Sequence, residues 1–321
     1  MLSQKKNWHS CAECSNSHPV ETHYRSMPIT CSQWVVLVLA ASILLLFPCH
    51  QVLAAPVKID AWVNVPYAIQ YGFGSYSIGG ITTSTYRVPI TGCFPVGADE
   101  DNLSLKFTGY LGYTHVGFET YLLGPKLEIQ QDYVFLLPQL ELLIPLDSGL
   151  VVKPYVALGG GYAFNGHARF GTLSVSSQDS YDMLYSGGIG IHYERHVGQY
   201  LIQMGSKFGW AGEQDYSANS SDQNFGTLQS GLEVRHPSGV HLWGRELDLA
   251  GSFIYYRFFP AAEFSMQTEE PLKVENQYEF GLTLGMTKPN KLWFLTDPRI
   301  GASYRFGDGM TGFRLNLGFP F

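Results

Sequence analysis

The last nine residues of the chain, 313–321, alternate strictly between large apolar side chains and small or polar ones. The even positions hold Arg, Asn, Gly and Pro, and the odd positions hold Phe313, Leu315, Leu317, Phe319 and Phe321. Successive side chains of a β-strand point to opposite faces, so a strand here would have one entirely apolar face. The pattern predicts a terminal β-strand whose apolar face is covered either by a protein core or by lipid.

The same alternation recurs along the chain and predicts twelve strands. Residues 298–306 place Ile300, Ala302, Tyr304 and Phe306 on one face, and Gly307-Asp308-Gly309 then separates this segment from the last strand. A glycine-rich triplet in that position is typical of a tight hairpin turn. The other ten predicted strands are residues 68–77, 83–94, 103–113, 132–144, 152–164, 181–194, 200–210, 226–236, 247–258 and 275–286.

The lengths of the strands and of their connections favour a closed sheet in a membrane. Several segments are near the roughly 9–11 residues that a tilted strand needs to cross the hydrocarbon core. The connections at one end are predicted at 79–80, 122–131, 165–180, 211–225, 260–274 and 307–309; those at the other end include 147–149, 196–199, 237–245 and 288–297. In lipid an unpaired strand edge leaves backbone amides unsatisfied. The sequence therefore predicts an all-β protein, a single antiparallel up-and-down transmembrane β-barrel of about twelve strands.

The C-terminal pattern closely resembles the last strand of bacterial outer-membrane β-barrels. In that superfamily a terminal Phe with apolar residues at alternating upstream positions marks the chain for insertion. The resemblance implies that Phe313, Leu315, Leu317, Phe319 and Phe321 form an insertion signal. It also implies a Gram-negative outer-membrane location, with outer-membrane lipid, lipopolysaccharide and the barrel-insertion machinery as partners. The oligomeric state stays open.

The strand count is also similar to that of the autotransporter family, which uses twelve-strand barrels. That family carries a large passenger before the barrel, whereas about a dozen residues, Ala55 to Val65, precede the first predicted strand here. An autotransporter-like barrel without a passenger is therefore one alternative. A large secreted β-sandwich or soluble barrel of similar strand count is another.

Composition agrees with a membrane barrel that is preceded by an export signal. Aromatic residues are 14% and charged residues 15% of the 321 residues, against roughly 25% charged in ordinary globular proteins. The mean hydropathy is close to zero, which argues against transmembrane helices. One apolar block, Trp34 to Phe47, is shorter than the roughly 20 residues that span a bilayer. We interpret residues 1–54 as a signal peptide with a long n-region, cleaved after Ala54, and residues 55–321 as the barrel domain; an uncleaved anchor and a start at Met27 remain alternatives.

Charge and cysteine content narrow the choice of partners. Residues 55–321 contain 17 Lys and Arg and 25 Asp and Glu, a net charge of −8, which argues against nucleic acid. Cys11 and Cys14 have CxxC spacing but lie before the predicted cleavage site without a second matching pair. We expect no metal and no cofactor. Cleavage would leave Cys93 as the one cysteine, so no intramolecular disulfide could form.

Charged residues at inward positions are candidates for the lining of the lumen. Such charge lines either a water-filled pore or a plug held by salt bridges, and the sequence leaves both open. A lumen of twelve strands lies between filled 8-strand barrels and open 16-strand porins, so any channel is narrow. Arg299, Arg305 and Arg314 on the last two strands suggest a preference for anions. The predicted lining residues are Arg87, Lys106, Glu141, Lys153, Asp182, Glu194, Lys207, Asp248, Glu279, Arg299, Arg305 and Arg314.

Candidate catalytic groups are few, and we expect no catalytic residue. His192 and His196 lie four residues apart on a strand, roughly 13 Å, which is too far for one metal ion. His167 shares a predicted outer loop with Asp179 and Asp182, so an outer-membrane hydrolase with a rim active site is an alternative. Adhesion through acidic outer loops is another, with Glu213, Asp215, Asp222, Glu263, Glu269 and Glu270. The favoured reading is porin-like passage of small polar solutes or a plugged structural barrel.

Overall fold

The computed structural model describes most of the predicted barrel domain. It covers residues 57–59, 65–78, 80–96, 103–121, 126–147, 149–176, 179–215, 223–242, 244–264, 272–287, 291–292, 295–296 and 299–321. The predicted signal peptide and its cleavage site after Ala54 lie outside the described residues and stay predictions.

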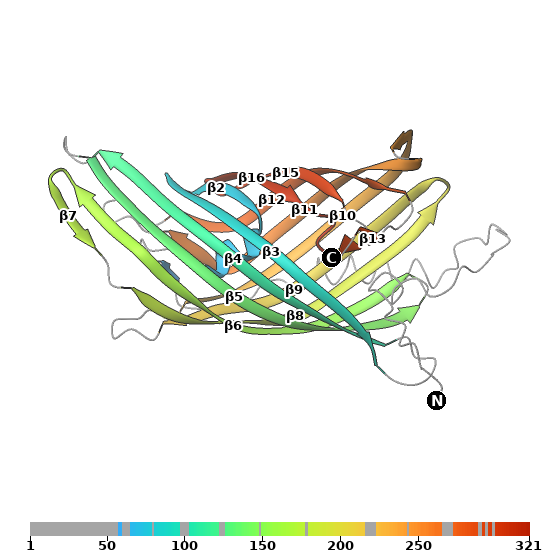
Figure 1. The fold of residues 1–321 in the computed structure, drawn as a ribbon, viewed down its shortest axis with the longest axis horizontal. Coiled ribbons are helices and arrows are strands. Elements are labelled where there is room, and N and C mark those ends of the chain that lie inside the picture. Colours follow the sequence, from blue (N-terminus) through green and yellow to red (C-terminus); the bar gives the residue numbers. More distant parts are fainter. Residues whose placement is uncertain are drawn as a thin grey trace, which may run out of the picture. The chain divides into compact units, whose positions relative to one another are not determined.

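Twelve antiparallel strands form a closed ring, here called the wall (Figure 1). Each wall strand pairs with its neighbours along the chain, and the last strand pairs with the first from Met310–Ile78 to Arg314–Gly74. The ring is therefore a single up-and-down β-barrel, as predicted. The wall strands are β2 (Gly74–Ile78), β3 (Ile81–Pro95), β4 (Ser104–Tyr121), β5 (Lys126–Asp147), β6 (Leu150–Phe170), β8 (Ser180–Val197), β9 (Tyr200–Asp215), β10 (Gln223–Leu242), β11 (Arg245–Phe264), β12 (Leu272–Met286), β15 (Ile300–Gly307) and β16 (Met310–Asn316).

Five shorter elements accompany the wall. A strand, β1 (Val57–Ile59), runs parallel to the end of β11, and β7 (Leu173–Ser176) extends the pairing of β6. The strands β13 (Lys291–Leu292) and β14 (Leu295–Thr296) form a separate two-stranded sheet. The helix α3 (Val65–Tyr71) precedes β2 and ends before Gly72, which has a φ of 91°. Among the described residues, no helix combines the length and the apolar character needed to cross a membrane.

Several strands continue well beyond the predicted segments. The strand β5 already begins at Lys126, and β10 continues to Leu242 with a register irregularity after Pro237. The predicted connections 122–131 and 237–245 are therefore largely strand. Backbone hydrogen bonds between strands do not depend on the side chains, so pairing continues where the alternating pattern fades. Figure 1 shows the long strands β4 to β6 extending toward β7 in this way.

The first and last predicted strands differ from the observed ones. Residues 65–71 form α3, and the strand predicted from residue 68 begins at Gly74. The strand predicted to end at Phe321 ends at Asn316, and the chain then bends at Leu317 and Gly318, where φ is 131° at Gly318. A single outward apolar face from Phe313 to Phe321 is therefore wrong for its last two aromatic residues, which turn inward.

Large apolar side chains cover the outside of the wall, and the inside holds buried charged residues together with apolar ones. Phe313, Leu282 and Ile300 are 68%, 64% and 66% exposed, whereas Glu279 and Arg305 are each 1% exposed. Every wall strand except β2 contributes exposed large apolar residues. The outer face thus differs from that of a water-soluble barrel, which is mostly polar.

Candidate functional site

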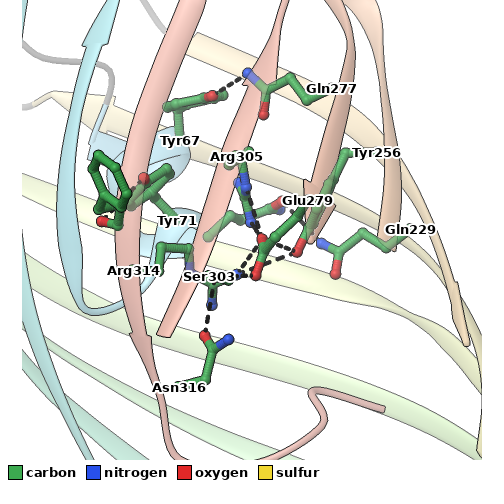
Figure 2. A network of polar contacts seen from close by, with 12 residues as sticks. Tyr67, Tyr71, Gln229, Tyr256, Gln277, Glu279, Ser303, Arg305, Arg314 and Asn316 are labelled. Atoms are coloured by element: carbon green, nitrogen blue, oxygen red, sulfur yellow. Dashed lines mark hydrogen bonds and ion pairs between the residues drawn. The ribbon is translucent and has the colours of Figure 1, made fainter. Parts of the chain in front are cut away.

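The helix α3 lies inside the ring and is held by polar contacts from several strands. The Arg87 Nη1 of β3 donates to the backbone oxygen of Ile69 at 2.7 Å. The amide of Gln277 on β12 donates to the Tyr67 hydroxyl (Figure 2). Tyr67, Ala68 and Tyr71 are at most 1% exposed. These contacts tie the short helix to two wall strands, β3 and β12.

The hydroxyl of Tyr71 contacts the two strands that close the ring. It lies 3.2 Å from the backbone oxygen of Ser75 on β2 and 3.3 Å from that of Phe313 on β16. A single hydroxyl proton is therefore shared between carbonyl groups of neighbouring strands. The end of α3 is positioned by the junction of the first and last wall strands.

Two apolar clusters meet at α3 and together involve most of the wall. The first joins Tyr67 and Tyr71 to β2, β9, β10, β11, β12 and β16 through Tyr76, Ile78, Ala211, Phe225, Ile254, Tyr256, Phe258, Val274 and Met310. The second joins Ile69 to β5, β6 and β8 through Tyr133, Phe135, Leu137, Ala157, Ala163 and Leu184, with Tyr110 of β4 packed against it. Because α3 belongs to both clusters, it bridges the lumen between two sides of the wall.

The C-terminal tail, residues 318–321, fills a further part of the interior. Phe319 and Phe321 pack against the first cluster, and their ring centres are 4.9 Å apart. A Cβ placed on Gly205 would overlap the Phe321 ring, so this position requires glycine for the close approach. We refer to α3 and the C-terminal tail together as the plug.

A buried carboxylate organises the polar contacts beside α3. The Glu279 Oε2 accepts hydrogen bonds from Arg305 Nε at 3.0 Å, Arg314 Nη1 at 2.7 Å and the Tyr256 hydroxyl at 2.9 Å. The Ser303 hydroxyl donates to Oε1 at 2.6 Å (Figure 2). Charge-assisted hydrogen bonds of this kind are stronger than neutral ones. The network joins β11, β12, β15 and β16 inside the wall.

Aromatic rings complete the surroundings of the buried guanidinium. Arg305 lies over the ring of Tyr256 at 3.8 Å and over that of Tyr71 at 4.8 Å from the ring centres. Cations are attracted to the faces of such rings. Arg305 is thereby held between Glu279 and aromatic residues from both the wall and the plug.

Two further ion pairs involve four more of the predicted lining residues. Arg299 binds Asp248 through two hydrogen bonds of 2.7 and 2.6 Å. Lys106 contacts Glu141 at 3.2 Å. Arg299, Arg305 and Arg314 all have carboxylate partners, and Arg305 and Arg314 share one carboxylate, that of Glu279.

The other predicted lining residues differ in their surroundings. Glu194 accepts a hydrogen bond from Gln203 at 2.5 Å, and Asp182 is partly buried on β8. Among the described residues no carboxylate lies within ion-pair distance of Arg87, Lys153 or Lys207. Lys207 instead lies over the ring of Tyr155 at 3.9 Å. Whether the twelve residues line a conducting lumen stays a prediction.

An interior cavity of about 120 Å³ remains between the plug and the wall. Arg87, Lys207 and Arg314 contribute its charged lining, together with neutral groups that include Gln139, Gln229 and Ser186. Gln70 of α3 and Pro320 of the tail also border it. All the charged groups that the described residues place around this cavity are cationic.

The structure separates the loop residues that suggested a rim active site. His167 Nδ1 contacts the backbone oxygen of Asn165 at 3.3 Å, and the Tyr162 hydroxyl donates to Asp179 at 2.6 Å. No hydrogen bond joins His167 to Asp179 in the described part of the chain. The residues covered by the structure also contain no group of three or more His, Cys, Asp or Glu side chains that could hold a metal ion.

A different histidine does have a carboxylate partner. On the outside of the wall His115 Nδ1 lies 2.8 Å from Asp132 Oδ1, and the Tyr113 hydroxyl and the Asn165 amide also donate to Asp132, at 2.7 and 3.0 Å. This cluster is not visible in the sequence because its members lie on three strands, β4, β5 and β6, and only the register between these strands brings them together. The pair can orient an imidazole. Ser84, opposite His115 in the register, directs its hydroxyl to Ser75 at 3.2 Å and not to the imidazole.

The closed ring of pairings defines the class of fold, a single up-and-down antiparallel β-barrel of twelve strands. No protein-family model and no curated protein matches the chain. Among solved structures it is similar to the β domain of the Bordetella autotransporter BrkA, with 13% identity over 76% of this chain and 91% of that one and a TM-score of 0.45. It is also similar to the translocator domain of the autotransporter NalP from Neisseria meningitidis, with 12% identity over 77% and 85% and a TM-score of 0.49.

Proposed function

We propose that this protein is an integral outer-membrane β-barrel whose lumen is closed by the plug. The observation that carries the membrane assignment is the outward face of the wall. Exposed large apolar residues occur on every wall strand except β2, and each wall strand pairs with a neighbouring strand on both sides. Contiguous apolar surface of this extent is unfavourable in water, and closure satisfies the backbone in lipid.

The interior supports a plug rather than an open pore. The two apolar clusters meet at α3, and the C-terminal tail packs against the first of them. Passage of a polar solute would require α3 or the tail to move. Of the two readings that the sequence leaves open, the geometry therefore favours the plugged barrel.

The test uses the full protein, expressed with its own N-terminal segment and purified from membranes in detergent. We expect it in the outer-membrane fraction and expect the unboiled form to migrate differently from the boiled form, because a closed sheet resists detergent. In planar bilayers we expect little conductance from the wild type and more from the variant Tyr67→Ala/Tyr71→Ala, which loses the α3 anchors. A compact monomer in buffer without detergent would refute the membrane assignment, and steady conductance of the wild type would refute closure.

A second candidate function, a barrel of the autotransporter type, is favoured by the position of β1. Residues Val57–Ile59 pair with Ala262–Phe264, at the mouth that also holds the β2–β3 and β15–β16 turns. The strand β16 ends toward the opposite mouth. If the mouth toward which β16 ends faces the periplasm, the chain before α3 reaches the cell surface. It would then have passed through the lumen.

Cysteine labelling on intact cells tests this second candidate. In a background in which Cys93 and the four cysteines before residue 55 are replaced by Ser, we expect Lys58→Cys to react with a membrane-impermeant maleimide. The matched control Gly198→Cys, in the β8–β9 turn at the opposite mouth, should react only after the cells are broken. Labelling of Gly198→Cys but not of Lys58→Cys on intact cells would contradict the proposed orientation.

A further inference from the structure

We propose that the interior cavity is a binding site for one small oxyanion of the phosphate, sulfate or carboxylate class. Such a site is additional to the closure of the lumen by the plug, and it does not require the passage of a solute. The proposal rests on three cations that border one cavity, on the lack of carboxylates to neutralise two of them, and on the size of the space.

Arg87 and Lys207 hold their charges without an acidic partner among the described residues. Arg87 Nη1 donates to the backbone oxygen of Ile69, and its guanidinium lies over the ring of Tyr110 at 4.5 Å. The Lys207 ammonium lies over the ring of Tyr155. Carbonyl oxygens and ring faces attract cations but do not cancel a full charge. A ligand with a negative charge would be stabilised by both groups.

Arg314 brings a third cation close to the first. Arg87 Nη2 lies 3.5 Å and Arg314 Nη2 lies 3.1 Å from the point where a Cβ on Gly72 would sit, so the two nitrogens are no more than about 6.6 Å apart. Glu279 is shared between Arg314 and Arg305, so one carboxylate serves two guanidinium groups. Arg314 Nε is buried without a hydrogen-bond partner in the part of the chain that the structure describes. The site therefore has both surplus positive charge and an unused donor.

The dimensions and chemistry of the cavity select the ligand class. A volume of about 120 Å³ accommodates several water molecules, at roughly 10–15 Å³ for each, or one small anion. Guanidinium groups present paired donors that match the paired oxygens of phosphate and carboxylate. A spherical halide has no such pair of acceptor atoms. The neutral lining residues Gln139 and Gln229 can add hydrogen bonds. A metal cation is disfavoured because it would face three like charges.

Calorimetric titration of the detergent-purified protein with inorganic phosphate tests the site. We expect saturable binding by the wild type that chloride at the same ionic strength does not reproduce. Lys207→Met keeps most of the apolar stem and removes the charge, so it should weaken phosphate binding roughly tenfold or more. Lys207→Arg should retain it. The matched control Lys106→Met removes an interior lysine that is paired with Glu141 and does not border the cavity, and it should change the affinity by less than about twofold.

Several results would overturn the proposal. They are the absence of saturable binding by the wild type, equal binding of chloride, and a Lys207→Met affinity equal to that of Lys106→Met. Sulfate and acetate titrations then distinguish tetrahedral from planar oxyanions as the preferred ligand. The heat-dependent gel shift of each variant, measured without phosphate, reports separately that the barrel is folded. Failure of the anion site is thus distinguishable from failure of the barrel assignment.

Discussion

Replacing Glu279 by Gln should destabilise the barrel more than any other single loss of charge in its wall. Glu279 is 1% exposed and accepts hydrogen bonds from Arg305, Arg314, Tyr256 and Ser303. The variant leaves two guanidinium groups in the interior without their shared carboxylate and turns an amide nitrogen toward one of them. Removing one partner of a buried ion pair costs about 3–5 kcal/mol, and we expect Glu279→Gln to fall in or above this range.

Urea unfolding of the protein in lipid vesicles, followed by tryptophan fluorescence, measures this free energy by linear extrapolation. A matched control is Glu119→Gln, because Glu119 contacts Lys126 at 2.8 Å but their side chains are 59% and 39% exposed. An exposed ion pair contributes about 0–1 kcal/mol, so the control should remain close to the wild type. Both variants replace Glu by Gln, so a difference between their free energies of unfolding reports the effect of burial and not that of the substitution itself.

A double-mutant cycle with Arg305→Met then isolates the interaction of the two side chains. Arg305→Met in the Glu279→Gln background removes one of the stranded charges, so the double variant should lose less stability than the sum of the single variants, by about 1–3 kcal/mol. A loss below about 1 kcal/mol for Glu279→Gln, or additive single effects, would refute the view that this network is a tightly coupled interior ion cluster.

Three further predictions concern the wall and the plug. Leu282→Arg on the proposed lipid-facing surface should lower the free energy of unfolding in vesicles by about 2–4 kcal/mol. The control Ser77→Arg, on the outward face of β2, should lower it by less than about 1 kcal/mol. Equal losses would contradict the proposal that the exposed apolar residues of the wall face lipid. Gly205→Leu should displace Phe321 and so speed the release of the C-terminal residue by carboxypeptidase. The control Gly251→Leu, which has open space around its Cβ position, should not change the release rate. Equal release rates for the two variants would contradict the packing of the C-terminal tail inside the wall. Arg87→Gln removes the charged hydrogen bond to Ile69, about 1.5–3 kcal/mol, and should raise the frequency of channel openings in planar bilayers; unchanged openings would contradict a role for Arg87 in holding α3.

The wall was predictable because its main signal is local. The wall strands repeat apolar residues with a period of two on their outer face, and Ile300, Tyr304 and Phe313 carry that signal within a few residues. The strand ends were not predictable from the same signal. Past Pro237 the chain still pairs with β11 at His241 and Leu242, but the register shifts there and the alternation is interrupted.

The plug was missed because its residues satisfy the strand pattern as well as the observed structure. Tyr67, Ile69 and Tyr71 alternate with Ala68 and Gln70, so the segment reads as a strand until the lumen around it is known. The tail shows the same ambiguity. Phe319 and Phe321 keep the apolar period, and only the turn at Gly318 directs them inward.

The interior pairs could not be read from parity alone. Alternation places Asp248, Glu279, Arg299 and Arg314 at inward positions, but Asp248 and Arg299 are 51 residues apart and Glu279 and Arg314 are 35 apart. Their meeting depends on the register across β11, β12, β15 and β16. Parity therefore predicts which charges lie inside, whereas the register decides which are neutralised and which remain available.

The junction between β2 and β16 has a consequence for how the barrel assembles. Only five residue pairs join these strands, whereas eighteen join β4 and β5. Tyr71 shares its hydroxyl between carbonyl oxygens on both sides of this short junction, so the helix fastens one of the shortest strand pairings of the barrel. Pairing of β2 with β16 and insertion of α3 into the lumen should therefore occur together. A chain whose helix is still outside the lumen would lack the Tyr71 contacts that stabilise this pairing.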